Sequence, residues 1–232
     1  MSLLLFFCLL LSHDIAAKKI IDSLERVLEN NLTLDSNRVD LLNRLGFEYW
    51  IVDPNQSEKF GRQALELSKI LNYQDGVAYA SRVVGVAHWV RGNYEPALEF
   101  LFRSQQNYQE VDDLLGEANA TMNIGLVYAD QANYDRALNY YNAALELFGL
   151  LDEQGRIATT FTKIGIVHAN QRKHDAAYDY FSRALAIHEA QGFQYGIAEV
   201  NRELGQLFLD TGDPDKSLSY LFRALEASET RN

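Results

Sequence analysis

The chain has 232 residues, of which 47% are hydrophobic and 23% charged, and its formal net charge is −11 at pH 7. These proportions are ordinary for a folded protein and disfavour wholesale disorder. An acidic chain without clustered Lys and Arg is a poor nucleic-acid binder, so a basic peptide or positively charged surface is the easier partner. The only cysteine, Cys8, excludes an internal disulfide framework and a cysteine-based zinc site. With only 3 prolines and many strong helix formers, the composition predicts an all-α fold.

The N-terminal segment begins with an apolar run from Ser2 to Leu11. Such a run is too short to span a bilayer core of about 30 Å as a helix, but it matches the apolar region of a secretory signal. Ile15-Ala16-Ala17 is an acceptable cleavage site. We therefore expect residues 1–17 to be a signal peptide or hydrophobic anchor of an exported, periplasmic or membrane-associated protein. The alternatives are a first helix of a cytoplasmic fold and a lipid anchor on Cys8.

Residues 18–36 form the next predicted segment. A short helical pattern runs to Asn30 and places apolar side chains on one face, followed by a polar connector. We expect this helix to cap the N-terminal end of the fold. Its predicted apolar face consists of Ile20, Ile21, Leu24, Val27 and Leu28.

From residue 37 onward the chain repeats one unit, which is clearest in residues 118–148. Two amphipathic helices are joined there by the turn residues 131–133. Neither helix can bury its apolar face alone, so each hairpin must pack on the next. A central glycine recurs at spacings of 39 or 40 residues, which predicts close backbone packing, because glycine costs about 1 kcal/mol relative to alanine in a helix. These glycines are Gly46, Gly85, Gly125, Gly165 and Gly205.

The second helices carry two small residues on either side of a bulky one at equivalent positions. The small residues would let the helices approach, and the bulky residue would fill the groove between them. The three sets are Ala97, Ala137, Ala177 and Ser217; Leu101, Tyr141, Phe181 and Leu221; and Ser104, Ala144, Ala184 and Ala224.

With these positions in view, the chain from residue 37 resembles the tetratricopeptide repeat family, whose aromatic slot would hold Tyr49, His88, Tyr128, His168 and Phe208. The resemblance implies a right-handed all-α solenoid of about five helix-turn-helix repeats plus the N-terminal helix. The repeats would span about 37–76, 77–116, 117–156, 157–196 and 197–232. The period exceeds the usual length of about 34, and so resembles the repeats of kinesin light chains and of bacterial peptide-regulated phosphatase regulators.

The same resemblance implies a concave, peptide-binding groove lined by the first helix of each repeat. Trp50 and Trp89 share one position in it, where they either anchor a ligand or pack repeat one on repeat two. Arg82, Asn123, Lys163 and Arg202 could form a weak clamp for a terminal carboxylate. The full predicted set is Asn43, Phe47, Trp50, Tyr79, Arg82, Val86, Trp89, Asn119, Met122, Asn123, Leu126, Asp130, Thr162, Lys163, Ile166, Asn170, Arg202 and Gln206.

No motif for catalysis, a cofactor or a metal occurs in the sequence: HExxH spacing, phosphate-binding and dinucleotide glycine clusters and a nucleophile elbow are missing. His88 and His168 are expected to pack in the aromatic slot. We therefore expect a non-enzymatic protein- or peptide-binding scaffold without cofactor.

The export signal and repeat pattern resemble the N-terminal sensory input region of bacterial histidine kinases and adenylate or guanylate cyclases. In those proteins a C-terminal signalling domain follows, and the apolar last helix, residues 215–228, favours such a continuation. The alternative is a cytosolic regulator or assembly scaffold that is not exported.

Overall fold

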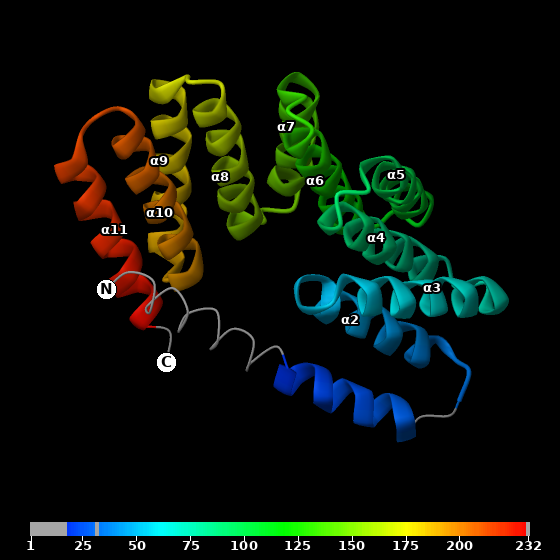
Figure 1. Ribbon diagram of the computed structural model, residues 1–232. Coiled ribbons are helices and arrows are strands. Elements are labelled where there is room, and N and C mark those ends of the chain that lie inside the picture. The colour runs from blue at the N-terminus through cyan, green and yellow to red at the C-terminus, as the bar shows by residue number, and fades with distance from the viewer. Residues whose placement is uncertain (1–17, 31–32, 231–232) are drawn as a thin grey trace. The chain divides into compact units, whose positions relative to one another are not determined.

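The structure, a computed structural model, describes residues 18–30 and 33–230, and every regular element in these ranges is a helix (Figure 1). The all-α repeat solenoid predicted from the sequence is confirmed. The predicted signal peptide or hydrophobic anchor, residues 1–17, lies outside the described residues. Within the described ranges no helix combines the length and the apolar character needed to cross a membrane.

The helices come in pairs of nearly equal length after an N-terminal helix at residues 18–30. We call α2, α4, α6, α8 and α10 the first helices and their successors the second helices. Each first helix from α4 onward begins three residues before the repeat start expected from the apolar pattern. The bounds are α2 Ser36–Val52, α3 Pro54–Leu71, α4 Gln74–Val90, α5 Tyr94–Glu110, α6 Leu114–Asp130, α7 Tyr134–Leu150, α8 Gln154–Asn170, α9 His174–Gln191, α10 Gln194–Asp210 and α11 Pro214–Glu229.

The turns between helices explain the regular period. One residue in the left-handed backbone region recurs every 20 residues, and it ends each helix from α3 to α10 after nearly the same number of turns. At Gly92 the amide donates to the carbonyl of Trp89 at 2.8 Å, and the Asn93 amide donates to His88 at 2.9 Å. The recurring residues are Asn72, Gly92, Asp112, Ala132, Asp152, Arg172, Gly192 and Gly212.

The turn between α2 and α3 is built differently. Asp53 caps α3, since its carboxylate accepts hydrogen bonds from the amides of Asn55 and Gln56 at 3.0 and 3.3 Å. Pro54 occupies the first helical position, where no amide hydrogen is needed. This shorter turn accounts for the single spacing of 39 rather than 40 between the central glycines.

Three central glycines, Gly85, Gly165 and Gly205, lie against the second helix of their own hairpin. A Cβ atom on Gly165 would lie 2.6 Å from the ring of Phe181, and one on Gly85 would lie 2.8 Å from Leu101 Cγ. Phe181 and Leu101 are the bulky residues predicted to fill the groove between the helices, and both are buried. The close packing inferred from the glycine spacing is therefore present in these hairpins.

The chain divides into two compact units, the first ending at Val127 and the second beginning at Tyr128. In the first, α2 packs on α3 and α4, α3 packs on α4, and α4 packs on α5. In the second, α7 packs on α8, α8 on α9 and α10, α9 on α10, and α10 on α11. In each unit a helix thus packs within its hairpin and on the neighbouring hairpin, as in a repeat stack.

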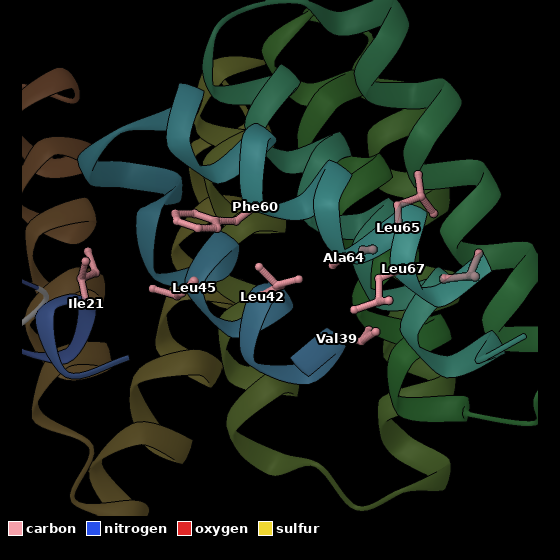
Figure 2. Packing of buried hydrophobic residues seen from close by; sticks show 10 residues of the cluster. Ile21, Val39, Leu42, Leu45, Phe60, Ala64, Leu65 and Leu67 are labelled. Atoms are coloured by element: carbon pink, nitrogen blue, oxygen red, sulfur yellow. The ribbon is translucent and has the colours of Figure 1, made fainter. Parts of the chain in front are cut away.

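The N-terminal helix joins the core of the first unit through a narrow stripe. Figure 2 shows Ile21 of this helix together with buried residues of α2 and α3. Ile21 is buried, and Leu24 and Leu28 are partly buried against the same cluster. Ile20 and Val27, which the sequence placed on the packed face, are instead 41% and 52% exposed. The prediction was too wide because a helix at the edge of a stack buries only the stripe that touches its one neighbour.

The last helix, α11, carries apolar side chains that its hairpin partner leaves uncovered. Leu218, Leu221 and Phe222 are 55%, 42% and 58% exposed. A hydrophobic cluster of the second unit is formed by buried residues of α9 and α10, among them Phe181, Val200 and Leu204, and Tyr220 of α11 packs against it.

Candidate functional site

The predicted groove residues of α2 and α4 lie together on one partly exposed surface. Trp50 of α2 stacks on Trp89 of α4, with ring centroids 6.2 Å apart and planes 18° from parallel. The guanidinium carbon of Arg82 lies 4.7 Å from the ring centroid of Tyr79 and 5.8 Å from that of Phe47. We call these five residues the aromatic groove face.

A small cleft lies within this face. It is lined by Phe47, Trp50 and Arg82 of the aromatic groove face and by Val86, a further residue of the predicted groove. The Ser57 hydroxyl, also in its lining, donates to a backbone carbonyl at 2.6 Å, which satisfies this buried polar group. The mixture of aromatic rings, one cation and aliphatic surface suits an extended or helical peptide.

A larger pocket of ≈ 440 Å³ opens in the same unit, lined by α2, α4, α5 and the adjoining turns. We call it the acidic pocket, because four carboxylates and one guanidinium line it. Phe47 belongs both to this pocket and to the aromatic groove face. The lining residues are Asp40, Asn43, Arg44, Phe47, Glu48, Tyr73, Asp75, Tyr79, Tyr108 and Asp113.

Hydrogen bonds hold several walls of the acidic pocket in place. The Tyr73 hydroxyl donates to Asp40 Oδ1 at 3.1 Å, and burial together with Asp40 raises the pKa of Tyr73. Burial raises the pKa of Tyr108 to about 12, although the nearby Arg82 guanidinium acts in the opposite direction. The amide Nδ2 of Asn43 donates to the carbonyl of Gly76 at 3.3 Å. The raised pKa values of Tyr73 and Tyr108 keep both hydroxyl groups neutral at physiological pH.

The predicted groove residues of α6 are more covered than those of α2 and α4. Asn119, Met122 and Asn123 are only 7%, 9% and 8% exposed, and Leu126 is partly buried. The Asn119 side chain donates to the carbonyl of Leu115 at 2.7 Å. The third repeat therefore offers a ligand less surface than the first two.

In the second unit two predicted cations already have carboxylate partners. Lys163 Nζ lies 2.8 Å from Glu199 Oε1, and Arg202 Nη2 lies 2.7 Å from Glu203 Oε1. Burial raises the pKa of Glu203, against the effect of Arg202. Their charges are thus compensated within the chain, which weakens the case for a terminal-carboxylate clamp.

The remaining predicted residues of the second unit differ in exposure. Thr162 is buried, and its hydroxyl donates to the carbonyl of Ala158 at 3.0 Å, so it has no surface for a ligand. Ile166 is partly exposed, and Asp130, Asn170 and Gln206 are exposed. Gln206 donates to Asp210 Oδ1 at 2.8 Å.

Comparison with known proteins identifies the family. The tetratricopeptide repeat profile matches residues 76–149 and 156–230, more than half of the chain. This chain belongs to the tetratricopeptide repeat family. The resemblance drawn from the glycine, small-residue and aromatic positions is confirmed. The sequence matches no curated protein at significant similarity.

Solved structures of other repeat proteins share the tetratricopeptide fold. BtubC (BKLC) from P. vanneervenii superposes with a TM-score of 0.68 and 22% identity over 93% of this chain and 89% of that chain. A putative kinesin light chain from Podosopora anserina superposes with a TM-score of 0.62 and 10% identity over 84% of this chain and 97% of that chain. The Rap conjugation gene regulator of plasmid pLS20, solved in complex with the Phr* peptide, superposes with a TM-score of 0.69 and 15% identity. The match covers 87% of this chain and 57% of that chain.

Each tetratricopeptide hairpin also contains a stacked pair of aromatic rings. The recurring position of the ring in the first helix was predicted from the sequence, but that of its partner in the second was not. The residue in the aromatic slot of the first helix stacks on a ring of the second helix, with centroids 5.4 to 5.8 Å apart. Those partner rings recur every 40 residues, which is the signal that would have found them. The pairs are Tyr49 with Phe60, His88 with Phe100, Tyr128 with Tyr140, His168 with Tyr180 and Phe208 with Tyr220.

His88 and His168 therefore pack in the aromatic slot, as expected. Burial lowers the pKa of both imidazoles, so the neutral form predominates at physiological pH. In the described part of the chain no group of three or more His, Cys, Asp or Glu side chains is arranged to hold a metal ion.

A charged cluster around Glu58 was missed by the sequence reading. Glu58 receives hydrogen bonds from Arg62 and Arg91 and lies 3.3 Å from His88 Nε2. Burial acts to raise the pKa of Glu58, but the two arginines outweigh it and hold the pKa below its ordinary value. Arg62 and Glu58 are four residues apart on one helix, a spacing that signals a pair, whereas Arg91 comes from the next hairpin.

Proposed function

We propose that this tetratricopeptide chain is a non-enzymatic scaffold that binds a peptide segment along the aromatic groove face. The observation that carries the proposal is the arrangement of Phe47, Trp50, Tyr79, Arg82 and Trp89 on one partly exposed surface of α2 and α4. Trp, Tyr and Arg are enriched among the residues that dominate the binding energy of protein interfaces. Tyr and Trp bury much apolar area at little cost in conformational entropy.

Two further observations support a peptide ligand. The Rap regulator of similar fold was solved in complex with a peptide, and what it binds is a precedent for the fold rather than for this chain. The net charge of −11 makes a segment with basic residues the easier partner.

The groove is tested through the intrinsic fluorescence of the protein. Both of its 2 tryptophans belong to the aromatic groove face, so their emission reports on this surface alone. A peptide selected from a randomised dodecapeptide display library should quench or shift this emission on titration. Phe47→Ala should weaken binding of that peptide by about tenfold or more.

The matched control is Phe222→Ala, which removes a ring from a second helix that is 58% exposed, against 41% for Phe47. It should leave the affinity unchanged. Equal affinity of the selected peptide for the wild-type chain and for Phe47→Ala would rule out the aromatic groove face as the binding surface, as would failure to select any peptide.

We further propose that the scaffold is the sensory input region of an exported or membrane-attached bacterial signalling protein. The support is the apolar run from Ser2 to Leu11 and the family resemblance described above. Mass spectrometry of the natural protein should find an N-terminus near Lys18. An intact Met1 in the cytosol would instead favour the alternative, a cytosolic regulator or assembly scaffold. A kinase or cyclase domain encoded in the same reading frame would support the sensory role.

A further inference from the structure

The acidic pocket in the first unit has the composition of a site for a cation. Asp40, Glu48, Asp75 and Asp113 supply four carboxylates. Two guanidinium groups oppose them, that of Arg44 in the lining and that of Arg82 over the Tyr79 ring. Carboxylates that share one concave surface create a negative potential, which the low-dielectric walls concentrate. A positively charged group is therefore favoured in the pocket over a neutral or negative one.

Aromatic rings form much of the remaining wall. Phe47, Tyr73, Tyr79 and Tyr108 line the pocket, and Arg82 already covers the Tyr79 ring at 4.7 Å. Ring faces attract cations and also pack against the methylene groups of long basic side chains. The wall thus suits a cation on an alkyl stem better than a small inorganic ion.

A buried acceptor in the lining points to a ligand that donates hydrogen bonds. Asn43 is 2% exposed, and its Oδ1 accepts no hydrogen bond. Its Nδ2 donates to the carbonyl of Gly76, a group that only accepts, so the orientation of the amide is fixed. The free atom is therefore an oxygen. The amide oxygens of Asn119, Gln171 and Asn201 are also buried without a donor, but the Asn43 oxygen is the one among them that belongs to the pocket lining.

We propose that the acidic pocket binds a basic side chain, Arg or Lys, of the bound peptide. This inference rests on the peptide-binding function proposed above and names the chemistry that the groove prefers. The pocket volume of ≈ 440 Å³ is within the usual range for ligand sites, about 300–1,000 Å³, which leaves room for one long side chain and its adjoining backbone. Because Phe47 is shared, a peptide on the aromatic groove face can place such a side chain in the pocket.

The experiment uses peptides selected on the full chain from the randomised dodecapeptide library. We expect Arg or Lys to be enriched at one position of the selected sequences. Replacing that Arg by citrulline, or that Lys by norleucine, should weaken binding by about tenfold or more, because a charge-assisted contact is lost. Exchanging Arg for Lys in the same peptide shows which of the two basic groups is preferred.

The protein side of the test is the double variant Asp40→Asn/Asp75→Asn, in which both side chains are exposed and keep their size. Because Glu48 and Asp113 remain, the difference in affinity between the charged and the neutral peptide should shrink several-fold in this variant. The control, Asp179→Asn, removes an exposed carboxylate that pairs with Arg183 in the second unit. It should preserve the full difference between the two peptides.

The outcomes separate this inference from the proposed function. Selected peptides that lose affinity with Phe47→Ala, yet show no basic preference, would overturn the acidic pocket and leave the groove in place. A basic preference of undiminished size in Asp40→Asn/Asp75→Asn would equally overturn the pocket. Peptides insensitive to Phe47→Ala would overturn the groove itself, and the pocket inference with it.

Discussion

Trp50 and Trp89 stack with their ring centroids 6.2 Å apart, and they come from the first helices of successive hairpins. The pair therefore packs repeat one on repeat two, which is one of the two roles considered from the sequence. Both rings also remain partly exposed, so the same contact holds them in a fixed orientation on the groove surface. Whether they additionally anchor a ligand is a prediction, which the fluorescence titration tests.

The contact between Gly165 and Phe181 predicts a sharp difference between two glycine substitutions. Gly165→Ala should lower the free energy of unfolding by about 1–3 kcal/mol, because the new methyl group would lie 2.6 Å from the ring. Gly149→Ala should instead raise it by about 0.5–1 kcal/mol, since α7 has open space there. Urea unfolding curves measure both values. Equal effects of the two substitutions would contradict the hairpin packing.

The backbone conformation of the turn residue Ala132 predicts that glycine at this position would stabilise the fold. Its φ of 55° is in the left-handed region, which costs an L-amino acid about 1–2 kcal/mol. Ala132→Gly should therefore raise the free energy of unfolding by about 0.5–1 kcal/mol after the greater flexibility of the unfolded chain is included. Ala143→Gly, at an exposed position within α7, should lower it by about 1 kcal/mol. Destabilisation by both changes would argue against the left-handed turn.

The Glu58 cluster predicts that loss of the Glu58 carboxylate destabilises the fold more than loss of the Glu99 carboxylate. The Glu58 side chain is 17% exposed and bonds to two arginines, so Glu58→Gln should cost about 1–3 kcal/mol of stability. Glu99→Gln breaks an exposed helical pair with Arg103 and should cost at most about 0.5 kcal/mol. Chemical denaturation at neutral pH compares them, and a cost for Glu58→Gln no larger than that for Glu99→Gln would contradict the cluster.

The Glu58 cluster also predicts the direction in which folding stability changes with pH. The pKa of Glu58 is lower in the folded chain than its ordinary value of 4.5, so the folded state binds this proton less readily than the unfolded state. The resulting stabilisation is complete above about pH 4.5 and is lost as the pH falls through the lower folded pKa. Glu58→Gln should therefore have a shallower stability profile below this pH than the wild type.

The histidines of the aromatic slot predict a loss of stability at a milder pH. Burial lowers the folded pKa of His168 below its ordinary value of 6.5, so the unfolded chain takes up the proton first. The melting temperature should fall as the pH drops below about 6.5. Tyr128 occupies the same slot in the preceding repeat, so His168→Tyr should keep the ring stack while making the decline shallower. An unchanged profile would show that His168 makes no such contribution.

The repeat architecture was predictable because its causes are local and recur. The glycine series and the small and bulky residues of the second helices repeat at one period, and in these hairpins Gly85 meets Leu101 and Gly165 meets Phe181. Helix starts were less accurate, because the apolar pattern does not include the first turn of these helices. At α6 the Asp113 carboxylate caps this turn by accepting from the Gly116 amide, whereas α4, α8 and α10 begin without a side-chain cap.

The site was predictable only in part. The family positions include the five residues that lie together on the aromatic groove face. Exposure differs between repeats, however, and Thr162 and Asn119 are buried. The pairing of Lys163 with Glu199 joins two first helices and depends on how their side chains extend. The acidic pocket combines residues of several helices and turns, so neither its shape nor the unpaired oxygen of Asn43 follows from one repeat.

The central claim, that ligands bind to the face formed by the first helices α2 and α4, is tested most directly by hydrogen–deuterium exchange mass spectrometry. The exchange of backbone amides is compared with and without a saturating concentration of the selected peptide. We predict slower exchange in α2 (Ser36–Val52) and α4 (Gln74–Val90), centred on the segments that carry Phe47 and Tyr79. Protection confined to the second helices α3 and α5, with α2 and α4 unchanged, would contradict the account.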